Sequence, residues 1–165
     1  NSCGFHWREY NSGMKQDNQR QALLLAYMAG IFDGEGCLGI SKTKVEHPRR
    51  SPRYSAYVSF VNTDKRVVEM FRKRFTPSYS CIVEHNPKKV GYKVQYRWRT
   101  PGNQLVVHIL ETLLPYLVVK RAQALELLRY CRGKKVDGFK RHLGVPAREL
   151  VRRERYYQLL KAMKK

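Results

Sequence analysis

The stretch "AGIFDGEG", residues 29–36, joins a dense apolar segment to two carboxylates that are each followed by a glycine. The spacing of the apolar segment predicts a helix from about Gln21 to Asp33. After Gly36 the pattern changes to period two, with Leu38 and Ile40 alternating with small or polar residues, which predicts a strand. A helix therefore runs directly into a strand, and the two acids lie at the junction.

Further along the chain, alternation and capping residues predict three more strands and four more helices. The predicted strands cover residues 38–43, 54–63, 79–86 and 92–100, and the later helices cover residues 65–75, 103–114, 119–131 and 146–163. Asp64 is placed to cap the helix that begins at Lys65. This order predicts an α+β fold with one antiparallel sheet, helices on one face and an open opposite face.

The length of 165 residues is typical of a single domain with its own core. We expect residues 1–20, which lack periodicity, to form an extended or flexible lead, and residues 21–165 to form one domain that includes C-terminal helices from about residue 133. The four cysteines lie far apart without a Cys-x-x-Cys pair, which is typical of thiols in a reducing, intracellular compartment, whether organelle or cytoplasm. The apolar run is too short to span a bilayer, so no membrane partner is expected.

The chain carries 33 Lys and Arg against 13 Asp and Glu, a formal net charge of +20. This charge is spread through the periodic segments, with fifteen basic and four acidic residues both in 42–99 and in 120–165. A basic tail alone would indicate little, and acidic lipid is the competing partner for a basic surface. Basic residues woven into aromatic-rich strands favour a folded surface shaped to a long polyanion, with nucleic acid as the leading partner.

The last predicted strand, "YKVQYRWR" at residues 92–99, alternates apolar or aromatic side chains with long polar ones. Arg and Gln are suited to bidentate contacts with guanine and adenine in the major groove of DNA. The predicted DNA-facing residues, which alternate with the core positions of three strands, are Ser41, Thr43, Ser55, Tyr57, Ser59, Lys93, Gln95, Arg97 and Arg99. Basic residues near the hairpin tips are expected mainly to hold phosphates, and these are Lys42, Lys44, Arg49, Arg50, Lys88 and Lys89.

One stripe of the first helix is almost bare of side chains. Ala22, Ala26, Ala29, Gly30 and Asp33 fall within an arc of about 100° on a helical projection. Small residues let two helix backbones approach closely. A helix tucked against its own sheet is the alternative, but the remaining faces are apolar enough for that packing. The sequence therefore predicts that a second helix lies against the stripe, and no other segment of this chain carries a matching one.

The segment "MAGIFDGEG", residues 28–36, resembles the nine-residue LAGLIDADG signature of the homing endonucleases, with Glu35 in place of the second aspartate. The segment "LLPYLVVKRAQALELL", residues 113–128, resembles the second recurring segment of that family. The resemblance covers residues 22–132 and implies an α-β-β-α-β-β-α fold with a saddle-shaped antiparallel sheet. It also implies hydrolysis of both strands of DNA at a long site, with Mg²⁺ or another divalent cation such as Mn²⁺ or Ca²⁺. The single copy of the signature, together with the unmatched stripe, implies a homodimer and a near-palindromic site.

The resemblance also implies roles for individual residues. Glu35 would bind the metal with its carboxylate, and Gly34 with its carbonyl oxygen. Lys120 would stabilise developing charge or order the attacking water. Asp64 matches a position that often holds a water-positioning polar residue, although a helix cap accounts for it equally well. Asp33 is expected to end its helix and to bond across the pair of chains at the interface rather than to bind metal.

Two other interpretations remain open. The resemblance also allows a binder that does not cleave, either an RNA splicing cofactor (maturase) or a DNA-binding regulator. Residues 139–161, "FKRHLGVPARELVRRERYYQLLK", have spacing that suits a helix-turn-helix reading the major groove. The apolar residues of this segment suit a helical brace of the core equally, and we favour the brace. The sequence leaves the genetic context open, intron or other mobile element.

Overall fold

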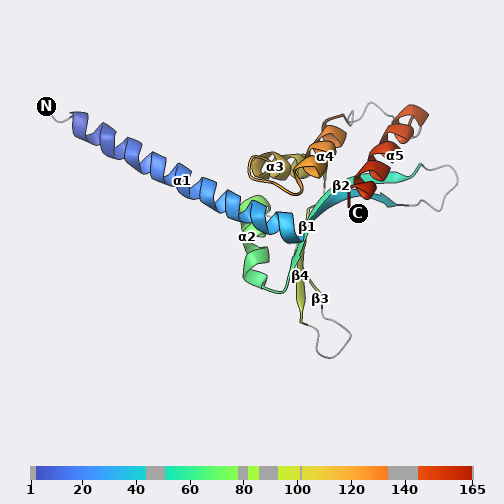
Figure 1. Ribbon diagram of the computed structural model, residues 1–165, viewed down its shortest axis with the longest axis horizontal. Helices are drawn as coiled ribbons and strands as arrows, with labels where there is room; N and C mark the ends of the chain where they lie inside the picture. Colours follow the sequence, from blue (N-terminus) through green and yellow to red (C-terminus); the bar gives the residue numbers. More distant parts are fainter. Residues whose placement is uncertain are drawn as a thin grey trace.

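The computed structural model describes residues 3–43, 51–77, 82–85, 93–100, 102–133 and 145–164. In these residues the helices and strands follow the predicted order (Figure 1). The helices are α1 (Cys3–Glu35), α2 (Lys65–Phe75), α3 (Asn103–Leu113), α4 (Arg121–Gly133) and α5 (Ala147–Ala162). The strands are β1 (Gly36–Thr43), β2 (Arg53–Asn62), β3 (Ile82–His85) and β4 (Gln95–Arg99). The predicted α+β fold is confirmed.

The first helix is much longer than predicted. Because α1 begins at Cys3, the prediction of an extended or flexible lead is wrong for residues 3–20. Once packing has nucleated a helix, each further residue extends it at little cost, and no proline interrupts residues 3–35. Figure 1 shows the N-terminal half of α1 projecting away from the rest of the molecule.

The four strands form an antiparallel sheet in the order β1-β2-β4-β3. Two hairpins supply the outer pairs, and β2 and β4 join them at the centre. Gly36 pairs with Phe60 in the first hairpin, so β1 starts directly at the end of α1. Figure 1 shows the helices along one side of the sheet and the opposite side, toward the lower right of the view, uncovered. The predicted open face is therefore present.

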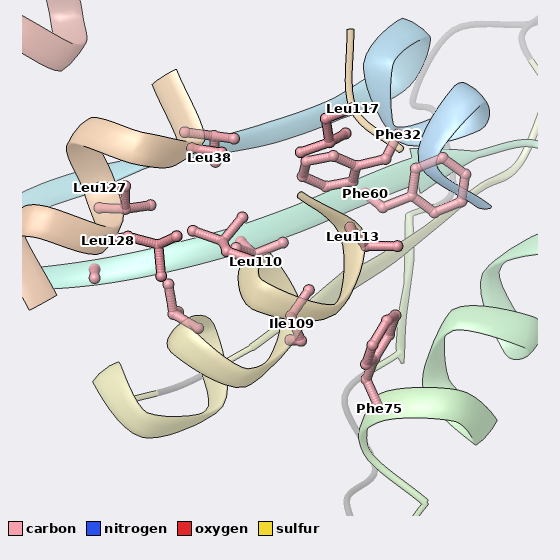
Figure 2. Close-up of a cluster of buried hydrophobic side chains, with 14 of the residues drawn as sticks. Phe32, Leu38, Phe60, Phe75, Ile109, Leu110, Leu113, Leu117, Leu127 and Leu128 are labelled. Carbon is pink, nitrogen blue, oxygen red and sulfur yellow. The ribbon is translucent and has the colours of Figure 1, made fainter. Parts of the chain in front are cut away.

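The core lies between the sheet and the helices (Figure 2). Aromatic rings fill the space between α2 and the two central strands. Phe71 stacks on Phe60 with ring centroids 4.7 Å apart and lies 5.7 Å from the ring of Trp98. The indole N–H of Trp98 donates to the Thr76 hydroxyl at 2.9 Å, so this buried ring has its polar atom satisfied. These ring contacts pack α2 against the two central strands.

The last helix braces an edge of the sheet. α5 packs against β1 and α4, and its Leu160 is buried in the core. The ring of Tyr157 meets that of Tyr54 edge-on at 6.3 Å. The carboxylate of Glu154 accepts a hydrogen bond from the Tyr54 hydroxyl, so polar contacts also hold the helix in place. The structure thus supports the bracing interpretation for the part of residues 139–161 that it describes. None of the described helices is both long and apolar enough to cross a membrane.

Candidate functional site

Three segments that are distant in the sequence meet where α1 ends. Glu35 is the last residue of α1, Asn62 is the last residue of β2, and Lys120 immediately precedes α4. The strand register explains why Glu35 and Asn62 are close. Gly36 pairs with Phe60 in an antiparallel ladder, so the residue before Gly36 lies beside the residues that follow Phe60. The predicted catalytic residues Glu35 and Lys120 therefore share one end of a helix.

Asp33 connects α1 to the start of α4. Its carboxylate accepts backbone N–H bonds from Val118 at 2.7 Å, Val119 at 3.2 Å and Lys120 at 2.8 Å. A carboxylate is favoured here because N–H groups near a helix N-terminus lack partners within the helix. The ammonium of Lys120 donates to the carbonyl of Asp33 itself. The prediction that Asp33 bonds across a pair of chains is therefore corrected: its carboxylate works within the chain and holds Lys120 at the site.

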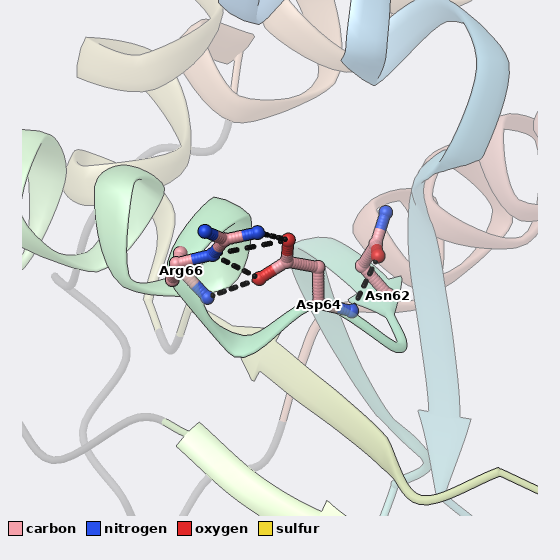
Figure 3. Close-up of polar contacts among 3 residues, drawn as sticks. All are labelled: Asn62, Asp64 and Arg66. Atoms are coloured by element: carbon pink, nitrogen blue, oxygen red, sulfur yellow. Dashed lines mark hydrogen bonds and ion pairs between the residues drawn. The ribbon is translucent and has the colours of Figure 1, made fainter.

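Asn62, which the sequence analysis did not single out, holds the Glu35 carboxylate. Its side-chain amide donates to Glu35 Oε2 at 2.6 Å, and its Oδ1 accepts from the backbone N–H of Asp64 at 2.7 Å. Figure 3 shows this second bond, with the amide nitrogen of Asn62 directed away from Asp64. The two bonds fix both ends of the amide, so Asn62 restricts the positions that the carboxylate can take.

The carboxylate of Asp64 caps the N-terminus of α2 and bonds to Arg66 rather than to Glu35. Its Oδ1 accepts the backbone N–H of Arg66 at 2.9 Å, which makes Asp64 the N-cap of α2 as predicted. The Arg66 guanidinium also donates to its carboxylate, at 2.7 Å to Oδ2 (Figure 3). Hydrogen bonds from Arg66 lower the pKa of the Asp64 carboxyl, so it is charged at neutral pH. The capping alternative accounts for both oxygens, and we assign Asp64 no catalytic role.

The exposed end of α1 suits part of a divalent-cation site. Glu35 and Gly34 are both exposed, and carboxylate and carbonyl oxygens are ligands that hard cations prefer. The space beside Gly34 is open, because apart from the adjacent residues and the nearby backbone of its own helix no atom lies within 4 Å of the position that a Cβ would take there. Within the described residues, no three His, Cys, Asp or Glu side chains are grouped to hold a metal ion. The residues present therefore fit part of a divalent-cation site.

The uncovered face of the sheet carries the predicted DNA-facing side chains. In β2 the core side is buried through Tyr54, Ala56, Val58 and Phe60, and the intervening residues face away from the helices. The uncovered face presents Ser41, Thr43, Ser55, Tyr57, Ser59, Gln95, Arg97 and Arg99, and Lys93 is exposed just before β4. The alternation that the sequence predicts is thus present in β1, β2 and β4.

Two arginines on this face differ in their surroundings. The guanidinium of Arg99 lies 4.5 Å from the ring centroid of Tyr57, which orients it over β2. Arg97 is exposed, and its register partners on the two neighbouring strands are Val61 and Val83. None of the ion pairs among the described residues involves Arg97. The guanidinium of Arg97 is therefore exposed on the uncovered face, and its neighbours on both adjacent strands are apolar.

The predicted phosphate contact of Lys42 is wrong. It was expected to hold phosphate at a hairpin tip, but it lies opposite Tyr54 on the helix side of the sheet and pairs with Glu154 at 2.7 Å. Strand alternation places it on the opposite face from Ser41 and Thr43, where a carboxylate of α5 neutralises it. The other predicted phosphate contacts, Lys44, Arg49, Arg50, Lys88 and Lys89, lie outside the described residues.

The sequence analysis also missed members of the uncovered face. Arg53 pairs with Thr43 and extends the alternation of β2 by one residue, so a strand predicted to begin earlier would have included it. Val61 and Val83 were overlooked because they are apolar, although Val83 is 55% exposed. Asn62 carried no periodic signal, since its role depends on where the end of α1 lies.

The outer side of α1 forms an apolar face, defined here as Leu23, Ala26, Tyr27 and Gly30. Leu23 is 65% exposed and Tyr27 is 58% exposed, and Ala26 and Gly30 are exposed between them. Ala29 is fully buried in the core of its own chain, so its predicted place at an interface is wrong. The spacing of 23, 26, 27 and 30 marks one side of a helix, and such an exposed apolar side is typical of an interaction surface.

Comparison with solved structures identifies the fold. The homing endonuclease I-CvuI, in complex with uncleaved target DNA in the presence of magnesium, superposes with a TM-score of 0.65 at 17% identity, over 87% of this chain and 83% of that one. The archaeal intron-encoded homing endonuclease I-Vdi141I, in complex with DNA, gives 0.63 at 16% identity, over 90% and 86%. The LAGLIDADG homing endonuclease I-LtrWI, bound to target DNA, gives 0.55 at 21% identity, over 68% and 37%. No family model and no curated protein matches the sequence. These likenesses establish the fold.

Proposed function

We propose that this chain, which has the LAGLIDADG homing endonuclease fold, is a homodimeric endonuclease that cleaves duplex DNA at a long, near-palindromic site with divalent cations. The observation that carries the proposal is the meeting of Glu35, Asn62 and Lys120 at the end of α1, beside the uncovered basic face of the sheet. The DNA complexes of proteins with the same fold support it.

The chemistry divides between the cation and the side chains around it. A bound Mg²⁺ or Mn²⁺ would polarise the phosphodiester and lower the pKa of an attacking water. Glu35 supplies a carboxylate ligand and Gly34 a carbonyl ligand, and the amide of Asn62 keeps the carboxylate in place. The Lys120 ammonium, held by Asp33, stabilises the negative charge that develops on the phosphate oxygens. The structure of I-CvuI in complex with its target in the presence of calcium is consistent with use of a divalent cation by proteins of this fold.

A second copy of this chain completes the site. The apolar face of α1 ends next to the segment held by Asp33, where Val118 and Val119 are 81% and 75% exposed. Pairing two such faces around a two-fold axis buries these side chains and brings two Glu35 carboxylates together. A two-fold dimer presents two copies of the same sheet surface, so a near-palindromic site is the geometric expectation.

The proposal is tested by selection from a DNA library. A pool of long duplexes is incubated with the protein and Mg²⁺, and the ends produced are sequenced. We expect one family of near-palindromic sites, cut on both strands. Binding of duplex DNA without any cut in Mg²⁺ or Mn²⁺ would instead favour the non-cleaving binder, and a structured RNA competing at equal salt would then identify a splicing cofactor.

Truncation of Asn62 is expected to slow cleavage without weakening DNA binding. Asn62→Ala frees the Glu35 carboxylate, and loss of a partner that orients a metal ligand typically costs about 10- to 100-fold in metal affinity or activity. The measurement is the single-turnover cleavage rate as a function of Mg²⁺ concentration, with a higher midpoint expected for the variant. Gln104→Ala, at an exposed amide on α3, is the control. Equal rates and equal Mg²⁺ midpoints for wild type and Asn62→Ala would show that Asn62 does not position the Glu35 carboxylate for metal binding.

Truncation of Arg97 is expected to relax one base position of the site. The guanidinium is exposed on β4, one of the two central strands of the sheet, so Arg97→Ala should cost about 1 to 3 kcal/mol of binding. Affinities for all single-base variants of the selected site measure this, and Arg129→Ala on α4 serves as the control, since its side chain is exposed on the helix layer. A uniform loss over all sequences would show that Arg97 contacts only the DNA backbone.

A further inference from the structure

A lysine from the C-terminal end of the described chain reaches the uncovered face of the sheet. The Lys164 ammonium donates to the Tyr57 hydroxyl at 3.0 Å and to Cys37 Sγ at 3.3 Å, and both partners belong to that face. A Cβ at Gly39, which would point to the same face, would lie 3.1 Å from the lysine nitrogen and 3.5 Å from the tyrosine oxygen. Tyr57 is opposite Gly39 in the register, so its ring crosses the glycine toward the edge strand and meets Lys164 there.

The path of the chain explains how a residue after α5 reaches this side. α5 packs on the helix side of β1, with Leu160 buried, and β1 is the edge strand of the sheet. The carbonyl of Met163 accepts a hydrogen bond from the Gln123 side chain of α4, and the N–H of Lys164 donates to the carbonyl of Lys161. These bonds hold the end of the helix at the edge, from which the long Lys164 side chain extends around β1.

The charge of Lys164 is not balanced by its contacts. Among the described residues, its partners are a hydroxyl, a thiol and the face of the Tyr57 ring at 5.3 Å, whereas Lys42 on the other side of the same strand pairs with a carboxylate. Arg99 lies 4.5 Å from the same Tyr57 ring. Two cations thus lie near one neutral ring, and an anion bound between them would reduce their mutual repulsion.

We propose that Lys164 binds a backbone phosphate of duplex DNA on the uncovered face, in a site formed with Tyr57 and Arg99. The inference rests on the proposed function and adds to the sheet a contact supplied by the chain after α5. Tyr57 orients both cations, and the absence of a side chain at Gly39 leaves room for the lysine. Because a phosphate carries no sequence information, this contact sets the affinity and position of the DNA rather than the choice of bases.

The test compares Lys164→Gln with Lys161→Gln, which removes the same charge from an exposed position one helical turn earlier. Binding to a pool of mixed-sequence 30-base-pair duplexes (about three turns of DNA) is measured by fluorescence anisotropy over a range of salt concentrations. We expect Lys164→Gln to raise Kd roughly fivefold and to reduce the slope of log Kd against log salt by about 0.9 for each lysine removed. Lys161→Gln should change both quantities much less. Equal effects of the two variants would overturn the inference.

Two further results separate a phosphate contact from a structural role. Lys164→Arg keeps the charge and should restore the salt slope. If the Lys164–Tyr57 bond were purely structural, its loss in Lys164→Gln would lower the thermal unfolding temperature and leave the salt slope unchanged. If the wild-type protein itself binds duplex DNA without salt dependence, the proposed function fails. If the wild type binds and Lys164→Gln retains its slope, only the role of Lys164 fails.

Discussion

Replacement of Glu35 by glutamine is expected to abolish DNA cleavage while leaving duplex binding nearly intact. Glu35→Gln keeps the size of the side chain and its capacity to accept a hydrogen bond from Asn62, but it removes the negative charge that would bind the cation. Metal-ion catalysis contributes several kcal/mol of transition-state stabilisation, so the cleavage rate should fall by about 1,000-fold or more. Cleavage of the selected site in Mg²⁺ and binding of the same site are measured on one preparation.

The matched control is Glu111→Gln, which neutralises an exposed carboxylate on α3. It changes the net charge by the same amount, so any general effect of charge on DNA affinity appears in both variants. Cleavage by Glu35→Gln at the wild-type rate would show that this carboxylate is not a metal ligand. Loss of DNA binding by Glu35→Gln alone would instead indicate that the residue organises the surface.

A bulky residue at Gly30 is expected to prevent the chains from pairing and thereby to abolish cleavage. Gly30 is exposed, and apart from the adjacent residues and the nearby backbone of its own helix no atom lies within 4 Å of a Cβ placed there, so a side chain can extend toward solvent without a clash. Replacing a helical glycine should even stabilise an isolated chain, by about 0.5 to 1 kcal/mol for alanine. A loss of function at Gly30→Arg must therefore arise from a second molecule. Sedimentation velocity measures the oligomeric state, and DNA cleavage is assayed beside it.

The control for Gly30→Arg is Gln21→Arg, which places the same side chain on α1 about half a turn away from the apolar face. We expect Gln21→Arg to sediment as a dimer and Gly30→Arg as a monomer with an unchanged or higher unfolding temperature. A Gly30→Arg variant that remains dimeric and active would show that the dimer interface lies on another surface. A wild-type protein that is monomeric at all concentrations, without DNA, would restrict pairing to the DNA-bound state.

The sequence predicted the helices and strands well because their signals are local. α2 begins and ends where its cap and apolar spacing place it, and the alternation in β4 separates buried Trp98 from exposed Arg97 as predicted. The long first helix was missed because residues 3–20 carry no amphipathic pattern of their own. Their helical state is an extension of a helix that packing stabilises further along, which local propensity does not reveal.

The sequence by itself determined the order of elements, the open face of the sheet and the place of Glu35 at a helix-to-strand junction. Only the tertiary structure decided which side chains complete the site. It placed Asn62 against Glu35, turned the Asp33 carboxylate to the start of α4, paired Lys42 with α5 and carried Lys164 around the edge strand. Periodicity reports the face on which a residue lies, whereas these contacts depend on strand register and on where distant chain ends meet in space.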